Sequence, residues 1–207
     1  TTLMLQWQVE LKDKLGIPSA VWLSAKKVWV DAHGHTIKTR GPEDIARCPC
    51  RIAIVSTGLI FHDSDERRYL LERRFVSVVL DEAHRARRRG ALGETRGEPN
   101  NLLAFMLRIG PRTKHLLLGT ATPIQTEAAE LWDLMRILNA GADFVLGRET
   151  LIHWVDWHKA LPVVKGTEIP VDERDAWEWL RNPLPPGDEE PTVASLRLQL
   201  GIPDNTF

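Results

Sequence analysis

The sequence contains few cysteines, no long apolar run and no excess of charge of either sign. Its two cysteines, Cys48 and Cys50, are separated only by Pro49, and no second pair of cysteines exists to complete a Cys-rich zinc site. A disulfide between cysteines this close would be strained. The sequence therefore predicts a reduced intracellular protein with incidental thiols.

Membrane insertion and secretion are not predicted. No stretch of ~18 apolar residues occurs, and no basic segment followed by an apolar leader is found near the start. We therefore expect a cytoplasmic protein without a membrane partner. The chain begins at Thr1 in sequence that is already patterned, without an initiator Met, which predicts a fragment of a longer protein.

The charged residues are almost balanced, with 27 Lys and Arg against 28 Asp and Glu. The chain as a whole would not attract a polyanion, so any contact with nucleic acid must come from a local patch. A length of 207 residues is enough for one sizeable α/β domain with an appendage.

Apolar residues recur at helical or strand spacing through residues 1–147. Met4, Trp7, Leu11 and Leu15 predict a helix over 3–15, in which Trp7 would be a core aromatic. Further helices are expected at 65–74, 101–109 (capped by Asn100 or Asn101) and 124–138, and strands within 20–34 and at 52–55, 75–80 and 115–118. This alternation favours an α/β fold with a parallel sheet that helices cover on both faces.

The sequence changes character after Gly147. Residues 148–182 contain Trp-rich segments that are expected to be helical, and residues 183–207 are Pro-rich and acidic, as in a linker. We interpret the tryptophans of the extension as helix-packing anchors, with base stacking as the alternative: Trp154, Trp157, Trp177 and Trp179. His33 and His35 have no third ligand in view, so a metal site is not expected there.

Two adjacent carboxylates, Asp81 and Glu82, directly follow the clearest strand and precede His84. Ligands of a parallel α/β sheet gather beyond the carboxyl ends of its strands. Mg²⁺ needs only one or two carboxylates together with phosphate oxygens, so Asp81 is a candidate magnesium ligand. Glu82 is a candidate general base for a water that attacks a γ-phosphate. The alternative is that the acidic pair merely caps a helix.

A second polar turn, Gly119-Thr120-Ala121-Thr122-Pro123, follows the strand at 115–118. The hydroxyls of Thr120 and Thr122 would then stand at the same sheet edge as the carboxylates, where they could bond to His84 or Glu82. The alternative is a Thr-Pro turn that simply begins the next helix.

Candidate nucleic-acid contacts are local. Four arginines occur within five positions, namely Arg85, Arg87, Arg88 and Arg89. Such a cluster needs water or phosphate to satisfy it, so it is either a phosphate-binding segment or a solvated loop. Ser56 and Thr57 leave a strand and could donate hydrogen bonds to backbone phosphates.

The segments "VVLDEAHRARRR" and "LLLGTATPIQTEAAELWDLMRIL" resemble motifs II and III of superfamily-two helicases, and most closely those of Swi/Snf-type double-stranded-DNA translocases. "TLMLQWQVEL" is similar to motif Ia of that family and "IAIVSTGLI" to its motif Ib region. The resemblance covers roughly residues 1–140 and implies a RecA-like first motor lobe, which we place at 1–147. It implies an ATPase in which Asp81 holds Mg²⁺, Glu82 is the catalytic base, and coupling residues link hydrolysis to movement: His84, Thr120 and Thr122.

The sequence also departs from the family pattern in two ways that bear on activity. The phosphate-binding loop G-x-x-x-x-G-K-[ST] and the second RecA-like lobe are absent from this chain, so we expect it to be inactive by itself. The partners implied are ATP, DNA and the second lobe of the same protein. Two alternatives stay open: a strand-separating or RNA-directed helicase of the same superfamily, and a binding scaffold without turnover.

Overall fold

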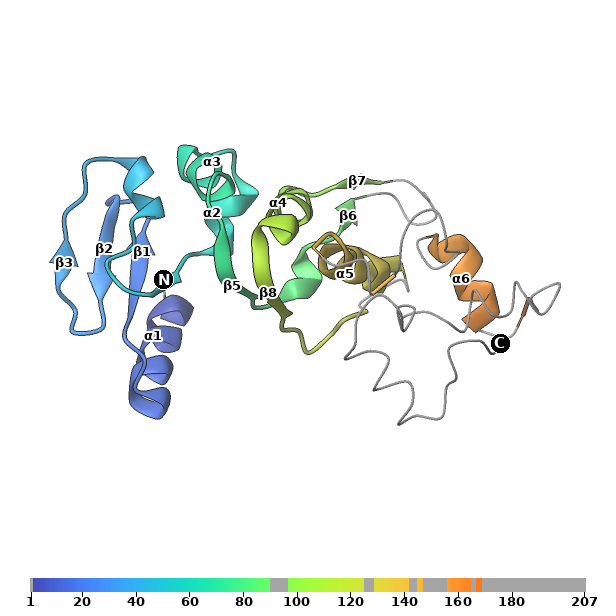
Figure 1. Ribbon diagram of the computed structural model, residues 1–207, viewed down its shortest axis with the longest axis horizontal. Coiled ribbons are helices and arrows are strands. Elements are labelled where there is room, and N and C mark those ends of the chain that lie inside the picture. Colours follow the sequence, from blue (N-terminus) through green and yellow to red (C-terminus); the bar gives the residue numbers. More distant parts are fainter. Residues whose placement is uncertain are drawn as a thin grey trace. The chain divides into compact units, whose positions relative to one another are not determined.

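In a computed structural model the chain divides into two compact units, residues 1–74 with 100–105 and residues 75–99 with 106–207 (Figure 1). The structure describes residues 2–89, 97–124, 129–141, 145–146, 156–164 and 167–168. Helices and strands are mixed in both units, so the α/β class expected from the sequence is confirmed.

The first unit contains a four-stranded sheet in the order β3-β2-β1-β4, built from β1 (Ser19–Leu23), β2 (Val28–Asp31), β3 (Thr36–Ile37) and β4 (Ile52–Ile54). β2 is antiparallel to both β1 and β3, and only β4 is parallel to β1. Trp22 and Trp29 are register partners, and their rings meet edge to face with centroids 5.1 Å apart. Both rings are buried, so the hairpin expected within 20–34 forms the core of this unit.

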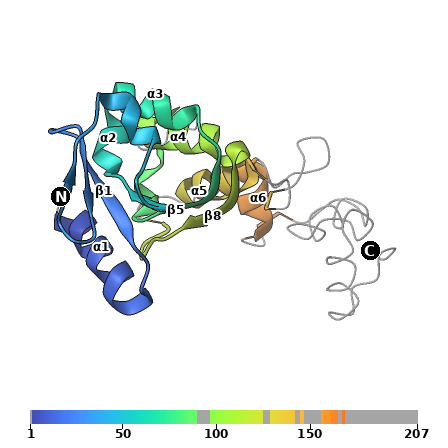
Figure 2. The same cartoon turned by 60° about the vertical axis from the view of Figure 1, so that its left-hand side comes forward.

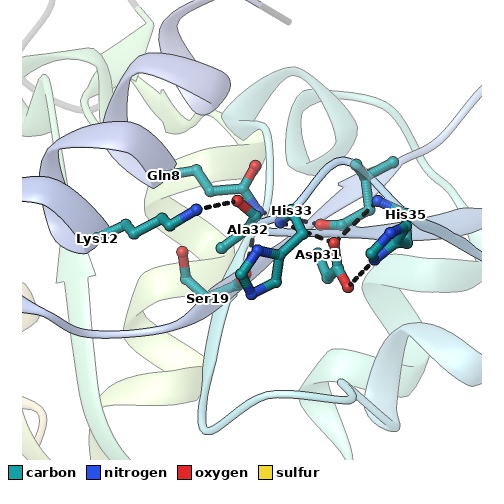
Figure 3. A network of polar contacts seen from close by, with 8 residues as sticks. Gln8, Lys12, Ser19, Asp31, Ala32, His33 and His35 are labelled. Carbon is teal, nitrogen blue, oxygen red and sulfur yellow. Dashed lines mark hydrogen bonds and ion pairs between the residues drawn. The ribbon is translucent and has the colours of Figure 1, made fainter.

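Helix α1 (Thr2–Leu15) is anchored to this sheet by polar side chains (Figure 3). Gln8 is its one buried residue, and its Nε2 donates to the carbonyls of Ser19 and Val30, at 3.0 Å each. The ammonium of Lys12 donates to the Ala32 carbonyl at 3.0 Å. Trp7 is 41% exposed, so the expectation that it is a core aromatic is wrong.

Short helices complete the first unit: η1 (Pro42–Ala46), α2 (Thr57–Phe61) and α3 (Asp65–Leu71). Serine hydroxyls cap the latter two, since Ser56 Oγ accepts from the Gly58 N–H and Ser64 Oγ accepts from the Arg67 N–H. Within α3 the buried carboxylate of Glu66 pairs with Lys27. The polar segment after β4 is therefore the start of a helix rather than an open loop.

Helix α4 (Asn101–Ile109) begins in the first unit and ends in the second. Asn100 Oδ1 accepts a hydrogen bond from the Leu103 N–H at 2.9 Å, which confirms the expected cap. Five apolar side chains of the helix are buried: Leu102, Leu103, Phe105, Met106 and Ile109.

The second unit contains a parallel pair of strands, β5 (Phe75–Leu80) and β8 (Thr113–Leu118), which lie side by side in both views (Figures 1 and 2). A short antiparallel ladder joins β6 (Arg88–Arg89) to β7 (Glu98–Pro99). The short helices η2 (Ala83–Arg85) and η3 (Gly110–Arg112) follow β5 and precede β8. Val79 and Leu117 are register partners that are 60% and 61% exposed, although the sequence predicted strands buried on both faces.

These sheets differ from the single parallel sheet that the sequence predicted. Among the described residues the largest sheet is mostly antiparallel, because residues 19–37 turn back twice, and the parallel strands β5 and β8 pair only with each other. The coarse α/β class thus holds, whereas a RecA-like parallel sheet between helices is not seen in the described part of the chain.

Two further helices, α5 (Ala129–Asn139) and α6 (Trp157–Val164), complete the second unit. Trp132 of α5 forms a small core with Leu146 and Ala160, and Trp157 packs against it. The expected packing role is therefore seen for Trp157, while the other tryptophans of the extension (Trp154, Trp177 and Trp179) and the linker 183–207 lie outside the described residues. None of the described helices has both the length and the apolar character needed to cross a bilayer.

Candidate functional site

The two polar turns predicted from sequence meet at the carboxyl ends of β5 and β8. The Gly119 N–H donates to the Leu80 carbonyl at 2.8 Å, and the Ala83 N–H donates to the Gly119 carbonyl at 2.9 Å. A Cβ placed on Gly119 would lie 3.9 Å from Asp81 Oδ1, so the glycine turn runs directly past the carboxylate. The parallel pairing of the strands therefore brings Asp81 and the Gly119–Pro123 turn together, as their positions after two strands predict.

Glu82 has a backbone conformation that is unusual for a residue with a side chain. Its φ and ψ are 53° and 47°, the left-handed region, which costs roughly 1–2 kcal/mol for an L residue other than glycine. Hydrogen bonds on both sides hold it there: Asp81 Oδ1 accepts from the Glu82 N–H at 2.9 Å, and the Glu82 carbonyl accepts from the Arg85 N–H at 3.0 Å. This turn leaves the Glu82 side chain 52% exposed, so its carboxylate is accessible to a ligand.

His84 joins the two turns through a single ring nitrogen. Its Nδ1 lies 3.0 Å from Thr120 Oγ1, 3.5 Å from Thr122 Oγ1 and 3.3 Å from Glu82 Oε2. Thr120 Oγ1 also accepts from the Thr122 N–H at 3.1 Å, which fixes the hydroxyl within its own turn. Because one nitrogen faces three oxygens, its protonation state decides whether His84 donates to the carboxylate or accepts from a hydroxyl. The His84 side chain is only 17% exposed, so these hydrogen bonds are largely shielded from solvent.

The donors at this edge suit a cation that takes most of its ligands from water and phosphate. Asp81 is half-buried at the end of β5, beside the backbone of Gly119. Within the described ranges, no three His, Cys, Asp or Glu side chains gather as a metal site. A magnesium ion needs only one or two protein carboxylates, so Asp81 is a candidate ligand for it.

Two of the four clustered arginines have carboxylate partners on α5. Arg87 Nη1 donates to Glu130 Oε1 at 3.1 Å. Asp133 uses both oxygens for Arg88: Oδ2 accepts the Arg88 backbone N–H at 2.8 Å, and Oδ1 accepts Nε at 3.3 Å. Burial raises the pKa of Asp133, against the lowering effect of the Arg88 N–H and charge. Sequence reasoning did not single out Glu130 and Asp133, although they lie three residues apart on one helix.

The remaining candidates for nucleic-acid contact fall in different parts of the chain. Arg85 ends the short helix η2, and Arg89 belongs to β6, where its backbone pairs with Glu98. Ser56 and Thr57 begin α2 in the first unit, and the Ser56 hydroxyl is used there as the helix cap. The structure therefore gathers Asp81, Glu82, His84, Thr120 and Thr122 at one place, whereas Ser56 and Thr57 belong to the other unit.

Comparisons of the chain with protein-family models, with curated proteins and with solved structures gave no match. The resemblance to helicase motifs therefore depends on the sequence segments alone.

Proposed function

We propose that this chain contributes the catalytic turn of an ATP-driven translocase on double-stranded DNA, of the superfamily-two type that its motifs resemble. The observation that carries the proposal is the bridge made by His84 between Glu82 and the hydroxyls of Thr120 and Thr122. A turn that only capped a helix would not require a carboxylate, an imidazole and two hydroxyls in contact at the ends of two parallel strands.

The finer fold that goes with this proposal is a RecA-like lobe, in which β5 and β8 belong to a larger parallel sheet. The parallel pairing of β5 with β8 supports it, because parallel strands occur almost only in larger α/β sheets. In such a lobe the carboxyl ends of the strands form the nucleotide site.

Each residue of the turn has a proposed role. Asp81 would hold Mg²⁺, which would supply positive charge to the β- and γ-phosphates of ATP. Glu82, exposed and held in its strained turn, would orient the attacking water and accept its proton. His84 would then report the charge at Glu82 to Thr120 and Thr122, because a proton on Nδ1 changes which of the three oxygens it binds.

The DNA contacts proposed from sequence have unequal support. Arg87 and Arg88 would have to share their guanidinium groups with Glu130 and Asp133, which reduces the positive charge they can offer to a phosphate. Arg85 and Arg89 remain candidates by position, as do Ser56 and Thr57. Phosphate contacts of this kind position a protein on DNA without reading its sequence.

The proposal requires a phosphate-binding loop outside these 207 residues, so the test uses a full-length protein that contains one, and the 207-residue chain by itself is expected to show no turnover. Glu82→Gln should abolish DNA-stimulated ATP hydrolysis and leave nucleotide affinity nearly unchanged, because the amide keeps the shape but cannot accept the proton. Asp81→Asn should also weaken Mg²⁺-dependent binding, and Glu98→Gln, at an exposed residue of β7, serves as the control.

Three results would contradict the proposal or redirect it. Turnover retained by Glu82→Gln would remove the carboxylate from the chemistry. DNA binding by the wild-type protein without any hydrolysis would favour the scaffold alternative. Stimulation by single-stranded RNA or DNA, rather than by duplex DNA, would favour a strand-separating or RNA-directed helicase.

A further inference from the structure

The segment that follows His84 is attached to helix α5 by an unusually complete carboxylate contact. Asp133 receives the backbone N–H of Arg88 at 2.8 Å and its side-chain Nε at 3.3 Å, so both carboxylate oxygens are used. The same arginine donates from Nη1 to the Gly97 carbonyl at 3.2 Å. One of these donors belongs to the main chain, so the contact fixes the path of the backbone and not only a flexible side chain.

The Arg88–Asp133 contact is poorly suited to adding stability. The Asp133 side chain is 7% exposed while that of Arg88 is 38% exposed, so the attraction is weakened by solvent at Arg88 and offset by the lost hydration of Asp133. The contact does fix the register of the segment around Arg88 against α5. If the segment slipped by one residue, the buried carboxylate would lose its main-chain donor, which is the costly outcome for a buried charge.

In the sequence, His84 lies between two residues whose backbone N–H groups are hydrogen-bonded to other parts of the second unit. On one side the Ala83 N–H is bonded to the Gly119 carbonyl at 2.9 Å, and on the other Arg88 is held on α5. Ala83 and Ala86 are both buried between them, and η2 packs against α5. The position of the imidazole relative to Thr120 therefore depends on both attachments.

We infer that Asp133, through Arg88, is a positioning residue that holds His84 against the Thr120–Thr122 turn. The ion pair of Arg87 with Glu130, one turn earlier on α5, supports the same arrangement. This inference rests on the proposed ATPase only for its kinetic consequence, since its structural consequence is measurable in the chain itself. Arg87 and Arg88 thus contact carboxylates of their own chain, in addition to any contact with phosphate.

The first experiment reads the His84 ring directly in the 207-residue chain, by nitrogen NMR of ¹⁵N-histidine protein, with His84→Gln used to assign the signal. Asp133→Leu removes both acceptors and should shift the His84 ring-nitrogen signals while the circular dichroism of the chain is retained. Asp133→Asn keeps an acceptor for the Arg88 N–H and should restore most of the wild-type spectrum. Arg112→Met, an exposed arginine on η3, is the matched control and should change nothing.

If Asp133→Leu fails to fold, Asp133→Ala provides the same test, because it also removes both acceptors and adds no bulk. A folded Asp133→Leu or Asp133→Ala chain with unchanged His84 signals would overturn the inference. In the full-length protein, Asp133→Leu should lower kcat for ATP by roughly tenfold or more and leave KM within about twofold, because misplacement acts on the chemical step. An increase in KM with kcat unchanged would also contradict the inference. A full-length protein without ATPase activity would refute the proposed function, and the NMR result would still judge the positioning role.

Discussion

Replacing Gln8 tests how α1 is held, because no other residue of this helix is buried. Gln8→Leu keeps a similar volume but removes two hydrogen bonds, to the carbonyls of Ser19 and Val30. Each such bond contributes a net ~0.5–1.5 kcal/mol, so we expect the free energy of unfolding of the first unit to fall by about 1–3 kcal/mol. The leucine cannot recover this by burial, since the atoms it would face are two carbonyl oxygens.

The assay is hydrogen exchange of the peptide covering 19–31 at increasing urea, because it reports the stability of β1 and β2 separately from the second unit. Lys12→Met is the matched control: it removes one exposed contact, to the Ala32 carbonyl, and should stay within about 0.5 kcal/mol of wild type. A Gln8→Leu variant as stable as Lys12→Met would refute the view that the amide anchors the helix.

Two further predictions concern single ionisable groups of the first unit. Burial raises the pKa of Cys48 to about 11. In a Cys50→Ser variant, the alkylation rate of Cys48 at pH 8 should therefore rise roughly tenfold when urea unfolds the chain. Unfolding increases the fraction of thiolate, and this increase outweighs the lower nucleophilicity of the unfolded thiolate. An equal rate in both states would contradict this. The N–H groups of His35 and His33 lower the pKa of Asp31, so the contribution of Asp31 to the β2–β3 turn is present above its ordinary pKa of 3.8 and is lost as pH falls through the lowered value. The amide NMR shift of His35 should titrate with a midpoint below 3.8, the Asp31→Asn variant should lack that step, and a midpoint above 3.8 would contradict the prediction.

The strands and several helix ends could be predicted because their signals are local. The strand expected at 75–80 is β5, and the Asn100 cap lies where its side chain predicts. The orientation of α1 could not be predicted in the same way. Its apolar residues suggested a core stripe with Trp7, but the helix docks through Gln8, because the carbonyls of two strands need donors that hydrophobic periodicity does not reveal.

The candidate site shows a similar division. Asp81 and Gly119 were expected to meet because each follows a strand, and the parallel register of β5 and β8 brings them together. The partners of the arginines could not be foreseen, since Arg88 and Asp133 are 45 positions apart. Sequence alone does not distinguish a basic segment that binds phosphate from one that is neutralised by carboxylates of its own chain.

The backbone of Glu82 gives an independent reason to favour chemistry over a passive scaffold. A left-handed residue is easiest to build with glycine, which adopts that conformation without steric cost. Here the position has a long, charged side chain, and its strain is held by the fixed N–H groups of the turn around it. The Glu82 side chain is half exposed, so the packing of that side chain does not account for the strain. Strain of this kind persists where the surrounding structure enforces it, and it clusters at sites of function. A glutamate at this left-handed position is therefore explained by its carboxylate and not by the turn itself. The proposed role of Glu82 as a general base requires that carboxylate.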